Sequence, residues 1–265
     1  MLHSSRIFTL SSLSLLAACT ANTSEDSGSG SDDTADYIFS MKITNGVTDV
    51  GIADIEACVE IPVDAEPVCN TSDANGMIES TYSPDDVVEG NAIIGLSGEG
   101  YWTTLNLGRV NADVLAAWDE SMETGGIIEF EYPIISEVLI NAALNDSGIT
   151  PEAGTGHAAT VLFAAEGTSV AGATITVWNE DGSEVNSTAY SDDAGATFDP
   201  TLTATTESGA FGSFNLSPGL YSMEITLEGA TCGPAIAWEA TEAGAIPFIV
   251  RADSISVSGV TCTVE

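Results

Sequence analysis

The sequence predicts a mainly β protein made of two antiparallel β-sandwich modules joined by a short helical bridge. Three observations lead to this prediction. Several short runs alternate apolar and polar side chains, glycine-containing turn pairs separate these runs, and the region 109–155 shows helical spacing instead. A period of two is typical of strands with one buried and one wet face, and many such strands between turns favour sandwiches. We therefore expect module 1 over 37–108, the bridge over 109–155 and module 2 over 156–265.

The first 18 residues have the layout of an export signal. Arg6 precedes an apolar stretch from Ile7 to Ala18, which is shorter than the roughly 20 residues needed to cross a bilayer. The stretch ends in Leu16-Ala17-Ala18-Cys19, which resembles the lipobox of bacterial lipoproteins. The resemblance implies cleavage before Cys19, lipid on its sulfur and a membrane anchor. Because the residue after Cys19 is Thr20 rather than Asp, the resemblance also favours sorting to the outer membrane. The alternative is an ordinary signal peptide with a chance cysteine at the cut.

Residues 19–36 are predicted to form a flexible tether. They are rich in Ser and acidic residues and lack large apolar side chains, so they cannot support a core. A flexible chain of this length spans roughly 20–25 Å. The tether would therefore hold the folded modules close to the membrane.

The alternating runs predict which side chains face each core. In these runs the apolar positions are Phe39, Met41, Ile43, Ile55, Ala57, Val59 and Ile61 in module 1, and Tyr221, Met223, Ile225 and Leu227 in module 2. Turn pairs such as Asn45-Gly46, Asn75-Gly76 and Asp181-Gly182 separate the strands. We expect one buried and one exposed face in each sandwich.

The bridge is predicted to contain two short helices. Asn111 is a suitable N-cap for a helix over 112–119. A second helix is expected from Pro133 to Leu144, with Pro in its first turn and apolar residues on one side, and Asn145–Gly148 would end it.

An internal repeat carries a second resemblance. Residues 170–178 read VAGATITVW and residues 206–225 read TESGAFGSFNLSPGLYSMEI, and a weaker copy occurs earlier with Gly76 and Gly100-Tyr101. These stretches resemble the carboxypeptidase regulatory-like module, over about 37–107 and 157–265. In the second copy the matching positions are Gly172, Ala173, Gly209, Phe211, Pro218, Gly219 and Tyr221, whereas the first copy has Asp54 and Ile55 in place of Gly-Ala. The resemblance implies Ig- or transthyretin-like sandwiches that serve as accessory or spacer domains.

Four cysteines follow Cys19, and an even number in an exported protein implies disulfides. Three pairings of the four are possible. We predict Cys58–Cys69 and Cys232–Cys262, because each pair then lies within one module. A zinc site built from all four is the alternative, although their spacing does not match the paired C-x₂-C pattern.

The charge of the chain excludes nucleic acid as a partner. After cleavage the chain would keep all 40 acidic residues and only Lys42, Arg109 and Arg251 as basic ones, a net charge of −37. Phosphate binding depends on Lys and Arg. The acidity either keeps the protein soluble in salt or binds cations such as Ca²⁺. The acidic runs Asp85-Asp86, Asp192-Asp193 and Asn179–Gly182 suit a Ca²⁺ site or a turn, so no metal ligand is assigned.

Few residues suggest catalysis. The processed chain has one histidine, His157, which we expect in a loop at the entry to module 2. A zinc peptidase of the H-E-x-x-H type needs two histidines, and no G-x-S-x-G motif is present. No catalytic residue and no cofactor are therefore predicted. Ca²⁺ remains the alternative for a bound ion. Tyr101, Trp102 and Trp178 could form a stacking platform for sugars, whereas Trp118 and Trp238 are expected to pack.

These observations predict a non-enzymatic lipoprotein of the cell envelope. It would be anchored through Cys19 and would act as a scaffold or interaction module for an envelope or extracellular protein. The alternative is a surface module that binds Ca²⁺ or a glycan. An accessory domain of a hydrolase is a further alternative.

Overall fold

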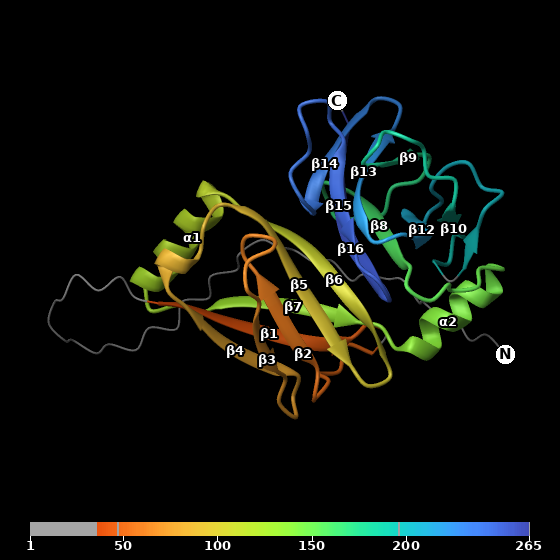
Figure 1. The fold of residues 1–265 in the computed structure, drawn as a ribbon. Helices are drawn as coiled ribbons and strands as arrows, with labels where there is room; N and C mark the ends of the chain where they lie inside the picture. The colour runs from red at the N-terminus through yellow and green to blue at the C-terminus, as the bar shows by residue number, and fades with distance from the viewer. Residues whose placement is uncertain (1–35, 47, 196, 265) are drawn as a thin grey trace, which may run out of the picture.

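The computed structural model describes residues 36–264, apart from 47 and 196. The predicted signal segment, the lipobox with Cys19 and nearly all of the tether lie outside the described residues. The protein is mainly β, as predicted, and its strands form three sheets that pack as two adjoining sandwiches (Figure 1). In the described part, no helix combines the length and apolar character needed to span a membrane.

The first sandwich begins with a three-stranded sheet in the order β4-β1-β7. Its strands are β1 (Tyr37–Asn45), β4 (Met77–Tyr82) and β7 (Ile128–Ile134). The apolar positions predicted on β1 point inward, with Ile43 fully buried. β1 pairs antiparallel with β4 but parallel with β7, so the pairing in this sheet is mixed.

The second sheet has ten strands and runs through both sandwiches. In the first half the order is β6-β5-β2-β3, with β2 (Glu56–Glu60), β3 (Val68–Thr71), β5 (Gly90–Gly98) and β6 (Tyr101–Val110). The short 3-10 helix η1 (Pro84–Asp86) lies between β4 and β5. Ala57, Val59 and Leu96 pack against β1 and complete the first core.

The same sheet continues into the second half in the order β11-β10-β12-β8-β16. Its strands there are β8 (Gly156–Ala164), β10 (Thr188–Ser191), β11 (Phe198–Asp199), β12 (Ala210–Leu216) and β16 (Ser254–Val264), and β14 (Ala230–Ile236) also pairs with β16. A third sheet, β15-β13-β9, covers this half. It consists of β9 (Thr174–Asn179), β13 (Gly219–Thr226) and β15 (Ile246–Val250). Tyr221 and Met223 of β13 are buried between the two sheets, as predicted from the alternation.

The helical bridge was predicted only in part. α1 (Ala112–Glu123) begins as expected, because the Asn111 side chain accepts a hydrogen bond from the backbone N–H of Val114. Its Trp118 packs on the first core. The helix predicted from Pro133 is wrong at its start, since Pro133 and Ile134 belong to β7, and α2 covers only Glu137–Asp146.

The physical reason for this difference is the position of β7 at a sheet edge. β7 pairs with β1 alone, and an edge strand tolerates a proline that cannot donate to the ladder. Residues 128–134 also alternate, with Ile128, Tyr132 and Ile134 buried and the glutamates exposed. The segment 109–155 is thus not only a bridge, because it supplies a strand to the first sandwich.

Candidate functional site

The joint between the two sandwiches is formed by β16. Residues 254–257 of β16 pair in parallel with 103–106 of β6, and residues 255–262 pair in parallel with 157–164 of β8. One strand near the C-terminus therefore links the halves through backbone hydrogen bonds on both of its sides. Such a joint leaves little freedom for a hinge.

The hydrophobic core of the second sandwich extends across this joint. Ile93 of β5 and Leu105 and Leu107 of β6 are buried in the same cluster as Met223. The Trp238 indole, buried as predicted, donates its Nε1–H to the carbonyl oxygen of Ala92 at 3.0 Å. The β5–β6 hairpin is therefore covered on both faces, since other residues of β5 face the first core.

Two of the three basic residues in the described chain also cross the joint. Arg251 donates two hydrogen bonds to the Glu60 carboxylate, at 2.5 and 2.7 Å. Arg109 forms an ion pair with Glu239 at 3.1 Å. Glu60 is only 7% exposed, and the hydrogen bonds from Arg251 hold the pKa of its carboxyl below the ordinary value despite this burial. Bidentate pairs of this kind fix relative orientation.

His157 does not lie in a loop, so this prediction was wrong. It is the second residue of β8 and only 1% exposed. Its Nδ1 accepts a hydrogen bond from the backbone N–H of Asn215 at 3.1 Å, and its ring lies against Trp102 and Phe214. Burial lowers the pKa of His157 to about 4. A neutral imidazole with an occupied acceptor nitrogen serves packing.

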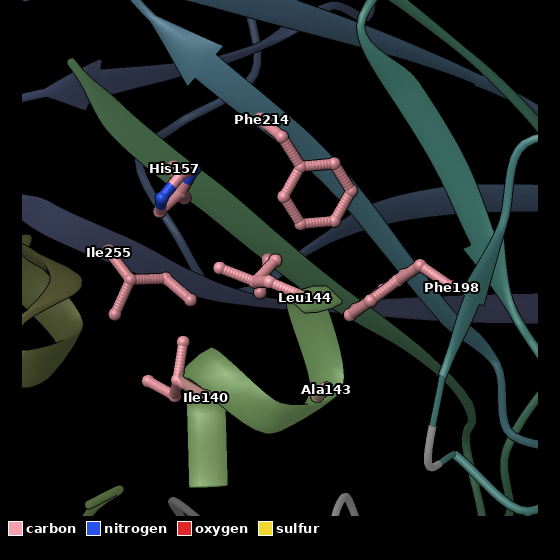
Figure 2. A pocket seen from close by; sticks show the side chains of 8 residues that line it. Ile140, Ala143, Leu144, His157, Phe198, Phe214 and Ile255 are labelled. Carbon is pink, nitrogen blue, oxygen red and sulfur yellow. The ribbon is translucent and has the colours of Figure 1, made fainter. Parts of the chain in front are cut away.

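A small cavity lies beside His157, between α2 and the outer face of the ten-stranded sheet (Figure 2). Ile140 and Leu144 of α2 point toward His157, Phe214 and Ile255 in this view. The cavity holds about 10 Å³, the lower limit of the space that one water molecule needs. It is too small to receive a substrate.

The predicted sugar platform is not assembled. Tyr101 packs against the first core, and Trp102 packs against the cluster under α2. Trp178 lies on β9 in the third sheet. The indole Nε1 atoms of Trp102 and Trp178 are both buried. The three side chains thus lie on different parts of the fold, and each is only partly exposed.

The acidic runs form turns. Asp85 and Asp86 lie in η1, and Asp181 accepts hydrogen bonds from the backbone N–H and hydroxyl of Ser183 at 2.9 and 2.6 Å. Asp192 accepts from the backbone N–H and hydroxyl of Thr197. Within residues 36–264 as described, no three His, Cys, Asp or Glu side chains gather as a metal site would require.

Both disulfides have the predicted pairing. Cys58 bonds to Cys69 across β2 and β3, and Cys232 bonds to Cys262 across β14 and β16. The first disulfide lies on the outer side, where Cys69 is exposed, whereas Cys262 is buried in the second core. Each bond fixes a strand that pairs on one side only.

Sequence reasoning missed the joint. The alternation over 55–61 puts Glu60 on the wet face of its strand, whereas the structure buries it, and the sequence shows Arg251 only as one of few basic residues. Two features of the sequence mark residues of the joint, although neither shows which strands they pair with. They are the alternating run at 254–264 and Arg251, three residues before it in a chain with few other cations.

No protein-family model matches the chain, so the resemblance to the carboxypeptidase regulatory-like module stays a prediction. No curated protein matches it in sequence either. Among solved structures, the chain is similar to the Bacillus anthracis TIE protein, with 14% identity and a TM-score of 0.28. The match covers 87% of this chain and 34% of that one, so the chain spans about a third of its length.

Two pilins are similar at the same level. The shaft pilin SpaA from Lactobacillus rhamnosus GG has 12% identity and a TM-score of 0.27, with 87% of this chain and 98% of the pilin covered. The major pilin subunit BcpA of Bacillus cereus has 11% identity and a TM-score of 0.26, with coverages of 87% and 100%.

Proposed function

We propose that the chain is an exported, lipid-anchored and non-enzymatic scaffold of the cell envelope that presents its second sandwich to a protein partner. The observation that supports this most is the joint at β16. It combines backbone pairing on both sides, a core shared between the halves and the bidentate contact of Arg251 with Glu60. A displayed scaffold benefits from such stiffness.

The place where the tether enters the fold supports the orientation. β1 begins at Tyr37, whose hydroxyl donates to Asp119 of α1 at 2.6 Å. In Figure 1, α1 and the start of β1 lie on the left, in the first sandwich, and β9 and β10 of the second sandwich lie on the far right. A lipid on Cys19 would therefore hold the first sandwich near the membrane and leave the second one farther out.

The residues that could have carried chemistry have structural roles. His157 is neutral, buried and bonded to the backbone of Asn215, and the cavity beside it is as small as one water molecule. The outer face of the third sheet is a more suitable contact surface. Leu220 is 44% exposed there and pairs with Ile249.

Fractionation tests the anchor. In cells that produce the full chain, wild-type protein should sediment with membranes, and Cys19→Ser should move it to the soluble fraction. Sedimentation of the variant with membranes would overturn the lipid anchor.

Site-specific crosslinking tests the scaffold. A photoreactive amino acid in place of Leu220 should give a protein adduct of one defined mass in intact cells. The same replacement at Val50, which is 63% exposed on the first sandwich, should not. Equal results at both positions would argue against presentation by the second sandwich. Turnover of ester or glycoside substrates by the purified chain would overturn the non-enzymatic proposal.

A further inference from the structure

Several asparagines in the chain are followed two residues later by Ser or Thr. Those in the described part are Asn70, Asn145, Asn186 and Asn215, and a further one, Asn22, lies outside it. This spacing is the acceptor sequence for N-linked glycans in exported proteins. The asparagine amide must be accessible to accept the sugar, and the hydroxyl two residues on must be free to contact the enzyme.

The structure excludes Asn70 as an acceptor. Its Nδ2 donates to the Ser80 hydroxyl at 2.9 Å within the first sandwich. The hydroxyl of Ser72, two residues on, donates to the carbonyl oxygen of Ile52 at 2.7 Å, and Ser72 is only 4% exposed. Both groups that the reaction needs are in use.

Asn145 and Asn215 are excluded in the same way. Asn145 lies inside α2, and the Ser147 hydroxyl donates to a backbone carbonyl and accepts from the N–H of Phe198. Asn215 donates its Nδ2 to the carbonyl oxygen of Thr150 at 3.0 Å and accepts from the backbone N–H of Glu152. The Ser147 hydroxyl and the Asn215 side chain thus hold neighbouring segments of the backbone together.

Asn186 differs from the other three. It is exposed in the segment between β9 and β10, and neither its amide nor the Thr188 hydroxyl has a hydrogen-bond partner within the described chain. The next residue, Ser187, is fixed by a backbone hydrogen bond from Phe214 at 2.8 Å. The acceptor amide therefore lies on an exposed segment whose backbone is held in place by this hydrogen bond.

Sequence, exposure and hydrogen bonding thus single out Asn186 among the asparagines of the described chain.

We propose that Asn186 is an N-glycosylation site. In the cell this proposal rests on the proposed export, because the transfer takes place outside the cytoplasm. The Asn186 amide nitrogen attacks the anomeric carbon of an oligosaccharide linked to a lipid through pyrophosphate. The new C–N bond forms, the amide nitrogen loses one proton, and the lipid pyrophosphate leaves with the electrons of the broken C–O bond. The glycan would stand on the second sandwich, away from α1 (Figure 1).

The test uses purified full chain, folded and oxidised. The chain is incubated with a detergent-solubilised bacterial oligosaccharyltransferase and a lipid-pyrophosphate-linked oligosaccharide, and its intact mass is measured. We expect one added glycan, carried by the peptide that contains Asn186, and complete loss of the addition in Asn186→Gln. Asn145→Gln is the matched control and should keep it.

Two further variants separate recognition from folding. Thr188→Ser should keep the glycan, whereas Thr188→Val should lose it with an unchanged thermal melt. No addition to the folded wild-type chain, or an addition that persists in Asn186→Gln, would overturn the proposal. Because the assay uses purified protein, it does not depend on export, and failure of the membrane fractionation would leave its result intact.

Discussion

At the scale of single residues, His157 makes stability depend on pH. Burial lowers its pKa to about 4 in the folded protein, against roughly 6.5 in an unfolded chain. As pH falls from 6.5 to 4, the unfolded state binds a proton that the folded state does not. The free energy of unfolding should therefore decrease in this window, by about 3 kcal/mol at most.

The variant His157→Gln isolates this contribution, since its amide oxygen can still accept the N–H of Asn215. Urea denaturation at pH 7, 5.5 and 4 should show a stability advantage of wild type over the variant that shrinks as pH falls. An advantage that stays constant across these pH values would contradict the assignment.

The pair of Arg251 and Glu60 predicts a measurable coupling across the joint. Arg251→Met leaves a carboxylate that is 7% exposed without its cation. The substitution should cost about 2–3 kcal/mol, less than a fully buried pair because Arg251 itself is partly exposed. Glu60→Gln in the same background should recover part of this loss. The pKa of Glu60 is lowered, so the stabilisation is present at neutral pH and is lost as pH falls through the folded value.

The control for this double-mutant cycle is Lys42 with Glu131, whose charged atoms are 3.1 Å apart and whose side chains are 41% and 53% exposed. Its coupling should stay below about 1 kcal/mol. Equal coupling energies for the two pairs in urea denaturation would show that the burial of Glu60 does not strengthen its ion pair with Arg251.

At the scale of elements, the two disulfides should differ in their effect. They close loops with sequence separations of 11 and 30 residues, which corresponds to roughly 3 and 4 kcal/mol in the chain-entropy model. Cys262 also fills the second core, whereas Cys69 is exposed. The double variant Cys232→Ala with Cys262→Ala should therefore lose more stability than Cys58→Ala with Cys69→Ala.

Hydrogen exchange provides the element-level measurement. β14 pairs with β16 alone, so amides of 230–235 should lose protection first when its disulfide is removed. Equal protection of β14 in the two double variants would show that the pairing with β16 holds this strand without the disulfide.

The elements also show what the sequence can predict. β1 and β13 were predicted because their alternation is local, and α1 was predicted because Asn111 caps it. β7 was missed because Pro133 was taken for a helix start, and only the distant pairing with β1 makes 128–134 a strand. For the same reason, the burial of His157 was not visible in the sequence.

At the scale of the whole molecule, the joint could not be predicted. β16 pairs with β6 across some 150 positions of sequence, and no local period encodes which strands become neighbours. The alternating runs predicted the mainly β fold correctly. They could not show that the two sandwiches share a sheet, a core and an ion pair.

The acidity of the whole molecule leads to the last prediction. The three basic residues of the described chain are each engaged with a glutamate, so the large excess of carboxylates is left to repel one another. Salt screens such repulsion over about 10 Å at 0.1 M. The melting temperature should therefore rise with ionic strength, and CaCl₂, MgCl₂ and NaCl at matched ionic strength should give closely similar curves. A melting temperature that climbs and saturates with Ca²⁺ alone would instead show a specific site through linkage of binding to stability. Asp181 and Asp192, whose carboxylates lie in turns, would then be the first residues to substitute in locating that site.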